Sequence, residues 1–273
     1  MPWRPRALLL DFHGVIAESA VALTSEAEAS LDRQRETAVA LTSEAEADGF
    51  VARLHELVDA AVPPELIAAD LEAGFRAYGH WRDAMARPYA PAEITHARFW
   101  ADFVCADWPA PARAAVLARA TELVYAWATR VPALRLREGV MDVLEAASAD
   151  GIPVAVVSNT LCGAAFRDFL AGAGLGQRFA AQIYSDEAGV RKPNPALVLA
   201  ATDAIGVAPE YAWFVGDTPL RDVLAARRAG VGLAVLVRSG HPPDMPPDPR
   251  ATPDLIVDSM LDIHRLLVGV RGS

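Results

Sequence analysis

Short apolar runs alternate with longer helical patterns at the start of the chain and again over its second half. The runs predict buried strands at about 7–11, 153–158, 181–184, 212–216 and 232–237. Helical patterns between them cover about 139–150, 163–173, 195–206 and 219–229. Such alternation is typical of a doubly wound parallel sheet with right-handed crossovers. The sequence therefore predicts an α/β, Rossmann-like fold for these parts of the chain.

The last stretch of the chain carries shorter signals. Gly230 follows a helical pattern at the position where glycine commonly ends a helix. The proline-rich stretch 241–253 predicts an irregular surface loop. Residues 255–257 then predict a short edge strand, and 259–268 a closing helix.

Residues 17–135 differ from the rest, because helical patterns rich in alanine, glutamate, leucine and arginine replace the apolar runs. Proline clusters that should separate helices lie at 63–64, 88–91 and 109–111. We therefore expect an all-helical domain over 17–135, inserted into an α/β domain made of 1–16 and 136–273.

An identical nonapeptide, VALTSEAEA, occupies 21–29 and 39–47 in this helical stretch. The offset of 18 residues equals five helical turns at about 3.6 residues per turn, so both copies would present the same face. We interpret the repeat as a tandem duplication that lengthened a helix, since two copies are too few for a solenoid.

Aromatic residues are also frequent in the helical stretch. The favoured interpretation is that they form the core of this domain, and the alternative is that they line an apolar or sugar-stacking pocket. The residues concerned are Tyr78, Trp81, Tyr89, Phe99, Trp100, Phe103, Trp108 and Trp127.

Composition narrows the class of protein. A formal net charge of −10 over 273 residues argues against nucleic-acid binding. The two cysteines, Cys105 and Cys162, have no CxxC spacing and suggest neither a disulfide framework nor a zinc site. Asp11 and His13 interrupt the first apolar run too early for a signal peptide, and no run is long enough to predict a membrane helix. We expect a cytoplasmic protein.

Polar side chains follow several of the predicted strands. In an open parallel sheet, the carboxyl ends of the strands meet at one edge, where active sites form. Ser158 and its neighbour Asn159 could bind a phosphate there, through a hydroxyl and backbone N–H groups. Lys192 stands just before a proline-led helix start, which would present one ammonium rigidly. The acids and the histidine at strand ends are Asp11, His13, Asp217 and Asp222.

Taken in this order, acid, hydroxyl, lysine and acid pair, these segments resemble the motifs of the haloacid dehalogenase superfamily, whose commonest members are magnesium-dependent phosphatases. The resemblance covers residues 7–16 and about 136–237. It implies that the helical insertion is a cap domain, which in relatives with a cap at this place closes over the site and selects the substrate.

The resemblance also implies roles for individual residues. Asp11 would be the nucleophile that forms an aspartyl-phosphate, while Ser158 and Lys192, with Asn159 beside them, would hold the phosphoryl oxygens. A bound Mg²⁺ would be held by Asp11, Asp217 and the backbone carbonyl of His13, with Asp222 as a further ligand or supporting partner. These ligands are all oxygens, which a hard cation prefers.

The sequence departs from the phosphatase pattern at His13, where a second aspartate usually serves as general acid and base. Histidine could carry out both proton transfers, with an ordinary pKa near 6.5. Alternatively, His13 caps the loop and leaves a slow or inactive hydrolase. Two further alternatives are a 2-haloacid dehalogenase and a non-catalytic protein that binds a phosphorylated ligand or a partner protein. The favoured prediction is a Mg²⁺-dependent phosphatase of a small phosphorylated metabolite.

Overall fold

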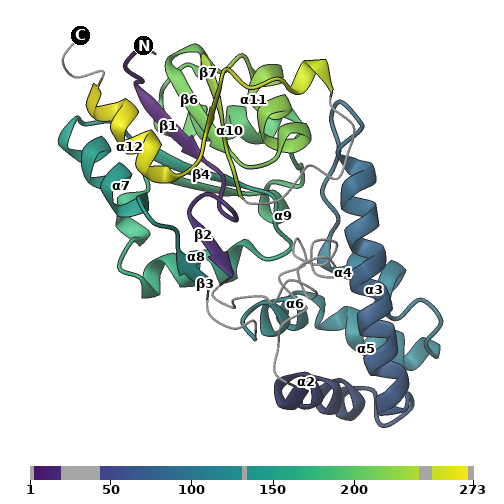
Figure 1. The fold of residues 1–273 in the computed structure, drawn as a ribbon. Coiled ribbons are helices and arrows are strands. Elements are labelled where there is room, and N and C mark those ends of the chain that lie inside the picture. Colours follow the sequence, from purple (N-terminus) through teal and green to yellow (C-terminus); the bar gives the residue numbers. More distant parts are fainter. Residues whose placement is uncertain (1–2, 20–43, 131–133, 240–247, 270–273) are drawn as a thin grey trace. The chain divides into compact units, whose positions relative to one another are not determined.

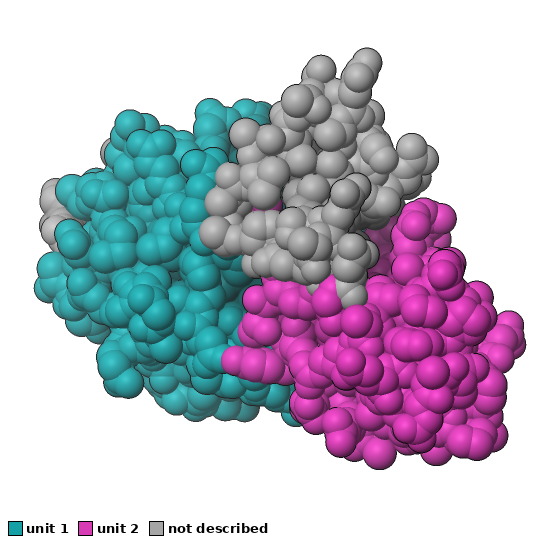
Figure 2. All heavy atoms as spheres, turned by 90° about the horizontal axis from the view of Figure 1, so that it is seen from below, with its two compact units in different colours: residues 1–18, 86–93, 134–273 teal, residues 19–85, 94–133 magenta. Residues whose placement is uncertain are grey.

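The computed structural model describes residues 3–19, 44–130, 134–239 and 248–269 (Figure 1). The duplicated nonapeptide therefore lies outside the described residues, apart from the backbone of 44–47. The chain divides into two compact units, which Figure 2 shows in different colours. A sheet unit comprises residues 1–18, 86–93 and 134–273, and a helical unit comprises 19–85 and 94–133.

The sheet unit contains a six-stranded sheet in the order β5-β4-β1-β6-β7-β8, and each neighbouring pair is parallel. Its strands are β1 (Ala7–Leu10), β4 (Val154–Ser158), β5 (Ala181–Tyr184), β6 (Ala212–Gly216), β7 (Leu233–Val237) and β8 (Leu255–Val257). Strands β1, β4 and β6 are buried along their whole length, because helices cover both faces of the sheet. The predicted doubly wound fold is confirmed, and so is the short edge strand.

Alternate side chains of β1 enter two separate cores. Leu8 and Leu10 pack with α7 (Val140–Ala149), α8 (Gly163–Gly172) and α12 (Met260–Gly269). Ala7 and Leu9 pack with α10 (Pro195–Ile205) and α11 (Leu224–Ala229) on the opposite face (Figure 1). Because successive side chains of a strand point to opposite faces of the sheet, β1 contributes to the core under each layer of helices. Gly230 ends α11 with a φ of 74°, as predicted.

The sequence did not predict several short elements of the sheet unit. A two-stranded sheet pairs β2 (Ala17–Ser19) with β3 (Leu134–Leu136), where the chain leaves and re-enters this unit. The other short elements are α9 (Ser185–Ala188) and the 3₁₀ turns η2 (Gly176–Arg178), η3 (Pro209–Tyr211) and η5 (Pro249–Ala251). The helix predicted over 219–229 is present as a π-helical turn, η4 (Pro219–Val223), followed by α11.

The helical unit consists of α2 (Glu44–Leu57), α3 (Pro64–Met85), α4 (His96–Phe99), the π-helical turn η1 (Trp100–Val104), α5 (Ala110–Ala118) and α6 (Ala120–Ala128). Prolines separate α2 from α3 and stand at the start of α5, as predicted. Over the described residues, no helix is long and apolar enough to cross a membrane.

Aromatic side chains form the core of the helical unit. Phe75 stacks on Trp127 with ring centroids 4.7 Å apart, and Trp100 donates its indole N–H to the carbonyl oxygen of Ala120. The core interpretation is confirmed for the buried members of the predicted aromatic set, which are Tyr78, Phe99, Trp100, Trp108 and Trp127. Tyr89, in contrast, is 63% exposed and belongs to the sheet unit.

Candidate active site

Three carboxylates meet at the carboxyl edge of the sheet. Asp11 directly follows β1, and Asp217 and Asp222 follow the neighbouring strand β6. Leu10 pairs with Val215 across these strands, so Asp11 and Gly216 leave the sheet at the same level. One oxygen of each carboxylate lies within 4.8 Å of one oxygen of each of the others.

Two glycines permit this close approach. Gly14 has a φ of +79°, and a Cβ at this position would lie 2.1 Å from Oδ2 of Asp217. A Cβ at Gly216 would lie 2.2 Å from Cβ of Asp222. Side chains at either position would force the carboxylates away. The space that the Gly14 turn leaves is therefore filled by a carboxylate of the site.

Lys192 joins two of the three carboxylates. Its Nζ lies 2.8 Å from Oδ1 of Asp11 and 2.5 Å from Oδ1 of Asp222, and it donates to the carbonyl oxygen of Val157 at 2.9 Å. The side chain is 1% exposed. Burial alone would lower the pKa of Lys192, but the charges of Asp11 and Asp222 raise it above its usual value. The ammonium is therefore a permanent positive charge in the site.

Asp11 and Asp222 are held differently. Oδ1 of Asp11 accepts hydrogen bonds from Lys192 and from the backbone N–H of Phe12 at 2.7 Å. Oδ2 of Asp222 accepts the backbone N–H groups of Asp217 and Thr218, at 3.2 and 2.8 Å, and the hydroxyl of Thr218. Asp222 thus fixes the turn after β6 with one oxygen and faces Lys192 with the other.

The pKa directions follow from these contacts. Burial raises the pKa of Asp11, and Lys192 only partly offsets this effect. Burial, with the charges of Asp222 and Asp11, raises the pKa of Asp217 well above its usual value. Burial alone would also raise the pKa of Asp222, but Lys192 and Thr218 lower it. Further positive charge near the cluster would therefore be needed to keep all three carboxylates ionised together.

This donor set fits a divalent cation. Three carboxylates and one ammonium leave a formal charge of −2 in a largely buried place. Hard cations such as Mg²⁺ take oxygen ligands of this kind. The three carboxylates are therefore candidate ligands for such a cation.

The remaining predicted residues follow β1 or lie at the end of β4, the strands next to the cluster in the sheet. Ser158 ends β4 and is 1% exposed, next in sequence to the carbonyl that accepts from Lys192. Asn159 binds the backbone of Lys192 through both side-chain groups: its Oδ1 accepts the N–H at 2.7 Å, and its Nδ2 donates to the carbonyl at 2.9 Å. His13 is half-buried in the turn after β1, and its backbone forms an isolated β-bridge with that of Ala17.

Sequence reasoning missed one group of residues next to Lys192. Glu93, Arg191 and Ser185 form a buried network in the sheet unit, with Glu93 between the other two. Arg191 directly precedes Lys192, but nothing in the sequence marks it as the partner of an acid nearly a hundred positions away.

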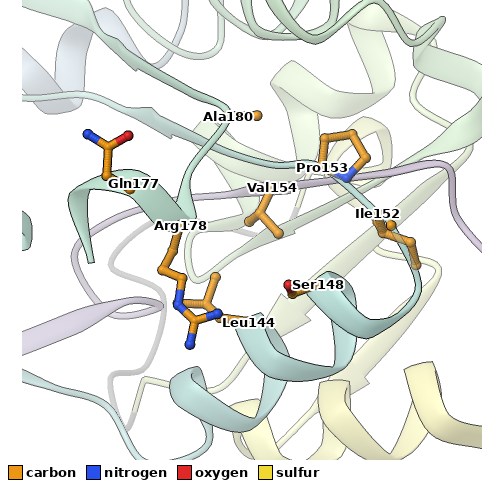
Figure 3. Close-up of a pocket in the computed structure, with 9 residues that line it drawn as sticks. Leu144, Ser148, Ile152, Pro153, Val154, Gln177, Arg178 and Ala180 are labelled. Carbon is orange, nitrogen blue, oxygen red and sulfur yellow. The ribbon is translucent and has the colours of Figure 1, made fainter. Parts of the chain in front are cut away.

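Two surface hollows in the described residues of the sheet unit lie away from the carboxylates. One, of about 330 Å³, is lined by Leu144 and Ser148 of α7, by Gln177 and Arg178 of η2, and by 152–154 at the start of β4 (Figure 3). Ser158 ends the same strand, so this hollow lies at the opposite edge of the sheet. The other, of about 460 Å³, is lined by Ala86, Arg87, Leu220, Leu224 and 248–250. Neither hollow includes a residue of the carboxylate cluster.

The described residues form an α/β protein with a helical insertion and a carboxylate cluster at the carboxyl edge of its parallel sheet. The model of the haloacid dehalogenase-like hydrolase family matches residues 5–230 of the chain. The chain belongs to this family, and the resemblance drawn from its motifs is confirmed.

Two curated relatives match part of the chain. It is 46% identical over 97 residues to the phosphoserine phosphatase of Thermus thermophilus, a match covering 36% of this chain and 37% of that protein. It is 34% identical over 125 residues to phosphoglycolate phosphatase 1 of Pseudomonas aeruginosa, covering 46% and 44%. The chain thus spans less than half the length of each of these relatives.

Solved structures show the same fold. A phosphatase of this superfamily from Thermococcus onnurineus is 17% identical, with a TM-score of 0.56 and coverage of 97% of this chain and 99% of that one. The hydrolase YfnB of Bacillus subtilis, solved bound to magnesium, is 15% identical, with a TM-score of 0.52 and coverage of 97% and 99%. At these identities, the likeness concerns the fold alone.

Proposed function

We propose that the protein is a Mg²⁺-dependent phosphatase of a small phosphomonoester, acting through an aspartyl-phosphate on Asp11. The observation that carries the proposal is the buried cluster in which Lys192 lies 2.8 Å from Asp11 and three carboxylates lie together. The partial relatives named as phosphatases support it. A 2-haloacid dehalogenase of this superfamily would need no metal, so the cluster favours the phosphatase.

In the first step, Oδ2 of Asp11 attacks phosphorus, and the bond between phosphorus and the leaving oxygen breaks. Both hydrogen bonds described for Asp11 are accepted by Oδ1, so they orient Oδ2 for this role. Lys192 and Ser158 hold the phosphoryl oxygens and offset their charge. Water then attacks the aspartyl-phosphate and releases inorganic phosphate and free Asp11.

A bound Mg²⁺ supplies positive charge that lowers the repulsion between a carboxylate and a phosphate dianion. We propose Asp11, Asp217 and the backbone carbonyl of His13 as its ligands. Asp222 would act as their supporting partner, because both of its oxygens bind groups of the chain. Asn159 would likewise act through Lys192, whose backbone it binds on both sides.

His13 is the proposed proton donor to the leaving alkoxide and the base for the attacking water. An imidazole can perform both transfers near neutral pH, and such catalysis is worth about 10²–10⁴-fold in rate. His13→Ala should therefore slow turnover of alkyl phosphates, whose leaving groups need a proton, far more than that of aryl phosphates. Equal losses on both substrates would assign His13 a structural role.

The test is phosphate release from a panel of phosphomonoesters with Mg²⁺ and with EDTA, with Asp11→Asn as the control. Release that requires both Mg²⁺ and Asp11 supports the proposal. Chloride release from 2-chloropropionate without phosphate release would replace it with dehalogenation. Near-normal phosphatase activity of Asp11→Asn would refute the nucleophile assignment.

A further inference from the structure

The loop that carries Lys192 is held by the connecting segment, residues 86–93, which belongs to the sheet unit. Backbone hydrogen bonds run from the N–H of Glu93 to the carbonyl of Gly189 at 2.9 Å, and from the N–H of Arg191 to the carbonyl of Pro91 at 3.3 Å. Asn194 also donates to the carbonyl of Pro91, at 3.3 Å. The residues before and after Lys192 are therefore both bound to this segment.

The carboxylate of Glu93 adds a buried ionic contact to the same loop. Its Oε1 lies 2.9 Å from Nη1 of Arg191, and both side chains are 1% exposed. Its Oε2 accepts the hydroxyl of Ser185 at 2.6 Å. Arg191 directly precedes Lys192, so the charge pair fixes the backbone from which the lysine extends.

The network continues to the loop after β4. The hydroxyl oxygen of Ser185 accepts the backbone N–H of Thr160 at 2.9 Å. Asn159, the preceding residue, binds the N–H and carbonyl of Lys192. Glu93 is thus connected to the loop that carries Lys192 and to the loop that directly follows Ser158.

A second arginine binds the connecting segment from α11. Nη1 of Arg228 donates to the carbonyls of Pro88, Tyr89 and Pro193, at 3.0, 2.8 and 3.1 Å. Pro193 follows Lys192, and the guanidinium also lies 4.7 Å from the centre of the Tyr89 ring. The connecting segment is therefore joined to the lysine loop twice, by the Glu93–Arg191 pair and by the guanidinium of Arg228.

From this network we infer that Glu93 is a positioning residue for Lys192 in the proposed phosphatase reaction. Lysine has a long, flexible side chain, so the direction of its ammonium depends on how firmly its backbone is held. A buried ion pair contributes little net stability over apolar residues of similar size. Its effect here is on geometry, because Glu93 fixes the Arg191 side of the lysine loop and, through Ser185, the loop after β4. The inference depends on the proposed function.

The experiment compares Glu93→Gln with wild type and with Glu187→Gln. Glu187 is a matched control, because it pairs with Arg167 at 2.8 Å on the surface, with the two side chains 45% and 42% exposed. The first readout is the affinity for inorganic phosphate in the presence of Mg²⁺, measured by calorimetry. The second is the kcat and KM for p-nitrophenyl phosphate, measured on protein that circular dichroism shows to be folded.

We expect Glu93→Gln to weaken phosphate binding and lower kcat by about 10–100-fold, the size of loss known for residues that orient metal ligands. Glu187→Gln should match wild type. In the background of Lys192→Met, Glu93→Gln should cause a much smaller further loss of kcat, because the main group that it positions is gone. A merely structural role would give additive losses in this double-mutant cycle.

Wild-type phosphate affinity and kcat in folded Glu93→Gln would overturn the inference and leave the proposed function intact. If Glu93→Gln does not fold, Glu93→Asp decides: the shorter carboxylate should still weaken phosphate binding, and unchanged affinity would overturn the inference. A wild-type protein that neither binds phosphate nor hydrolyses p-nitrophenyl phosphate would overturn the proposed function, and this inference with it.

Discussion

Gly14→Ala should weaken Mg²⁺ binding by more than its effect on the stability of the fold can explain. Gly14 has a φ of +79°, a conformation that costs an L-residue roughly 1–2 kcal/mol. A Cβ there would also lie 2.1 Å from Oδ2 of Asp217, whereas ordinary contact begins near 3.4 Å. The Asp217 carboxylate must therefore move by more than an ångström, away from its place in the cluster with Asp11 and Asp222.

Gly206→Ala is the matched control. Gly206 ends α10 with a φ of +66°, and its Cβ would meet nothing within 4 Å. Both variants carry the same kind of backbone strain, which should lower the melting temperature by about 2–4 °C per kcal/mol in a domain of 150–250 residues. Only Gly14→Ala moves a proposed metal ligand.

The assay is thermal unfolding at increasing Mg²⁺ concentration, because a ligand that binds only the folded state raises the melting temperature by an amount that grows with the logarithm of its concentration over its Kd. From this rise, we expect Gly14→Ala to bind Mg²⁺ about 10–100-fold more weakly than Gly206→Ala, since losing even a residue that orients a ligand costs this much. Equal Mg²⁺ affinities would refute the argument that Gly14 is required by the Asp217 carboxylate.

Three further predictions concern buried groups. Lys192→Met should lower the free energy of unfolding by about 3–5 kcal/mol in urea titrations with EDTA, because it leaves Asp11 and Asp222 uncompensated; a loss below about 1 kcal/mol, typical of an exposed pair, would contradict this. Asp217→Asn should raise the melting temperature in EDTA at pH 7.5, because burial, Asp222 and Asp11 raise the pKa of Asp217, so that its ionisation destabilises the fold increasingly as pH rises above its unfolded pKa. This gain should fade as the pH falls through the unfolded pKa of 3.8 and vanish well below it, where the folded and unfolded carboxyl are both protonated; an equal gain at low pH would point to another cause. Burial raises the pKa of the Cys105 thiol to about 11, so labelling of the native protein by a thiol reagent at pH 8 should be slow and should become rapid in urea; rapid native labelling would show an accessible thiolate.

The sheet could be predicted from the sequence because strands buried on both faces form continuous apolar runs. Leu8, Leu9 and Leu10 show this pattern, and their strand lies at the centre of the sheet. Strands β2 and β3 could not be predicted in this way, because polar residues interrupt them: Glu18 and Ser19 in β2, and Arg135 in β3. The equally short β8 consists of three apolar residues and was predicted.

The candidate site was predictable as a set of residues at strand ends, but not as a set of contacts. Asn159 was expected at a phosphate, and its side chain binds the backbone of Lys192. The prolines at 88–91 predicted the end of a helix and gave no sign that 86–93 packs with the sheet unit. Glu93 therefore had no visible partner, because its contact with Arg191 depends on tertiary packing between distant segments.

The contrast between Asp217 and Asp222 indicates which carboxylate depends most on a cation. Asp222 receives backbone N–H groups, a hydroxyl and the Lys192 ammonium, and its pKa is lowered in spite of complete burial. Asp217 has like charges as its strongest neighbours, and burial raises its pKa well above the usual value. The chain thus compensates the charge of Asp222 with its own groups and compensates that of Asp217 much less, as expected of the proposed Mg²⁺ ligand. Asp217 should therefore contribute more to Mg²⁺ affinity than Asp222, whose substitution should act mainly through the turn after β6 and through Lys192.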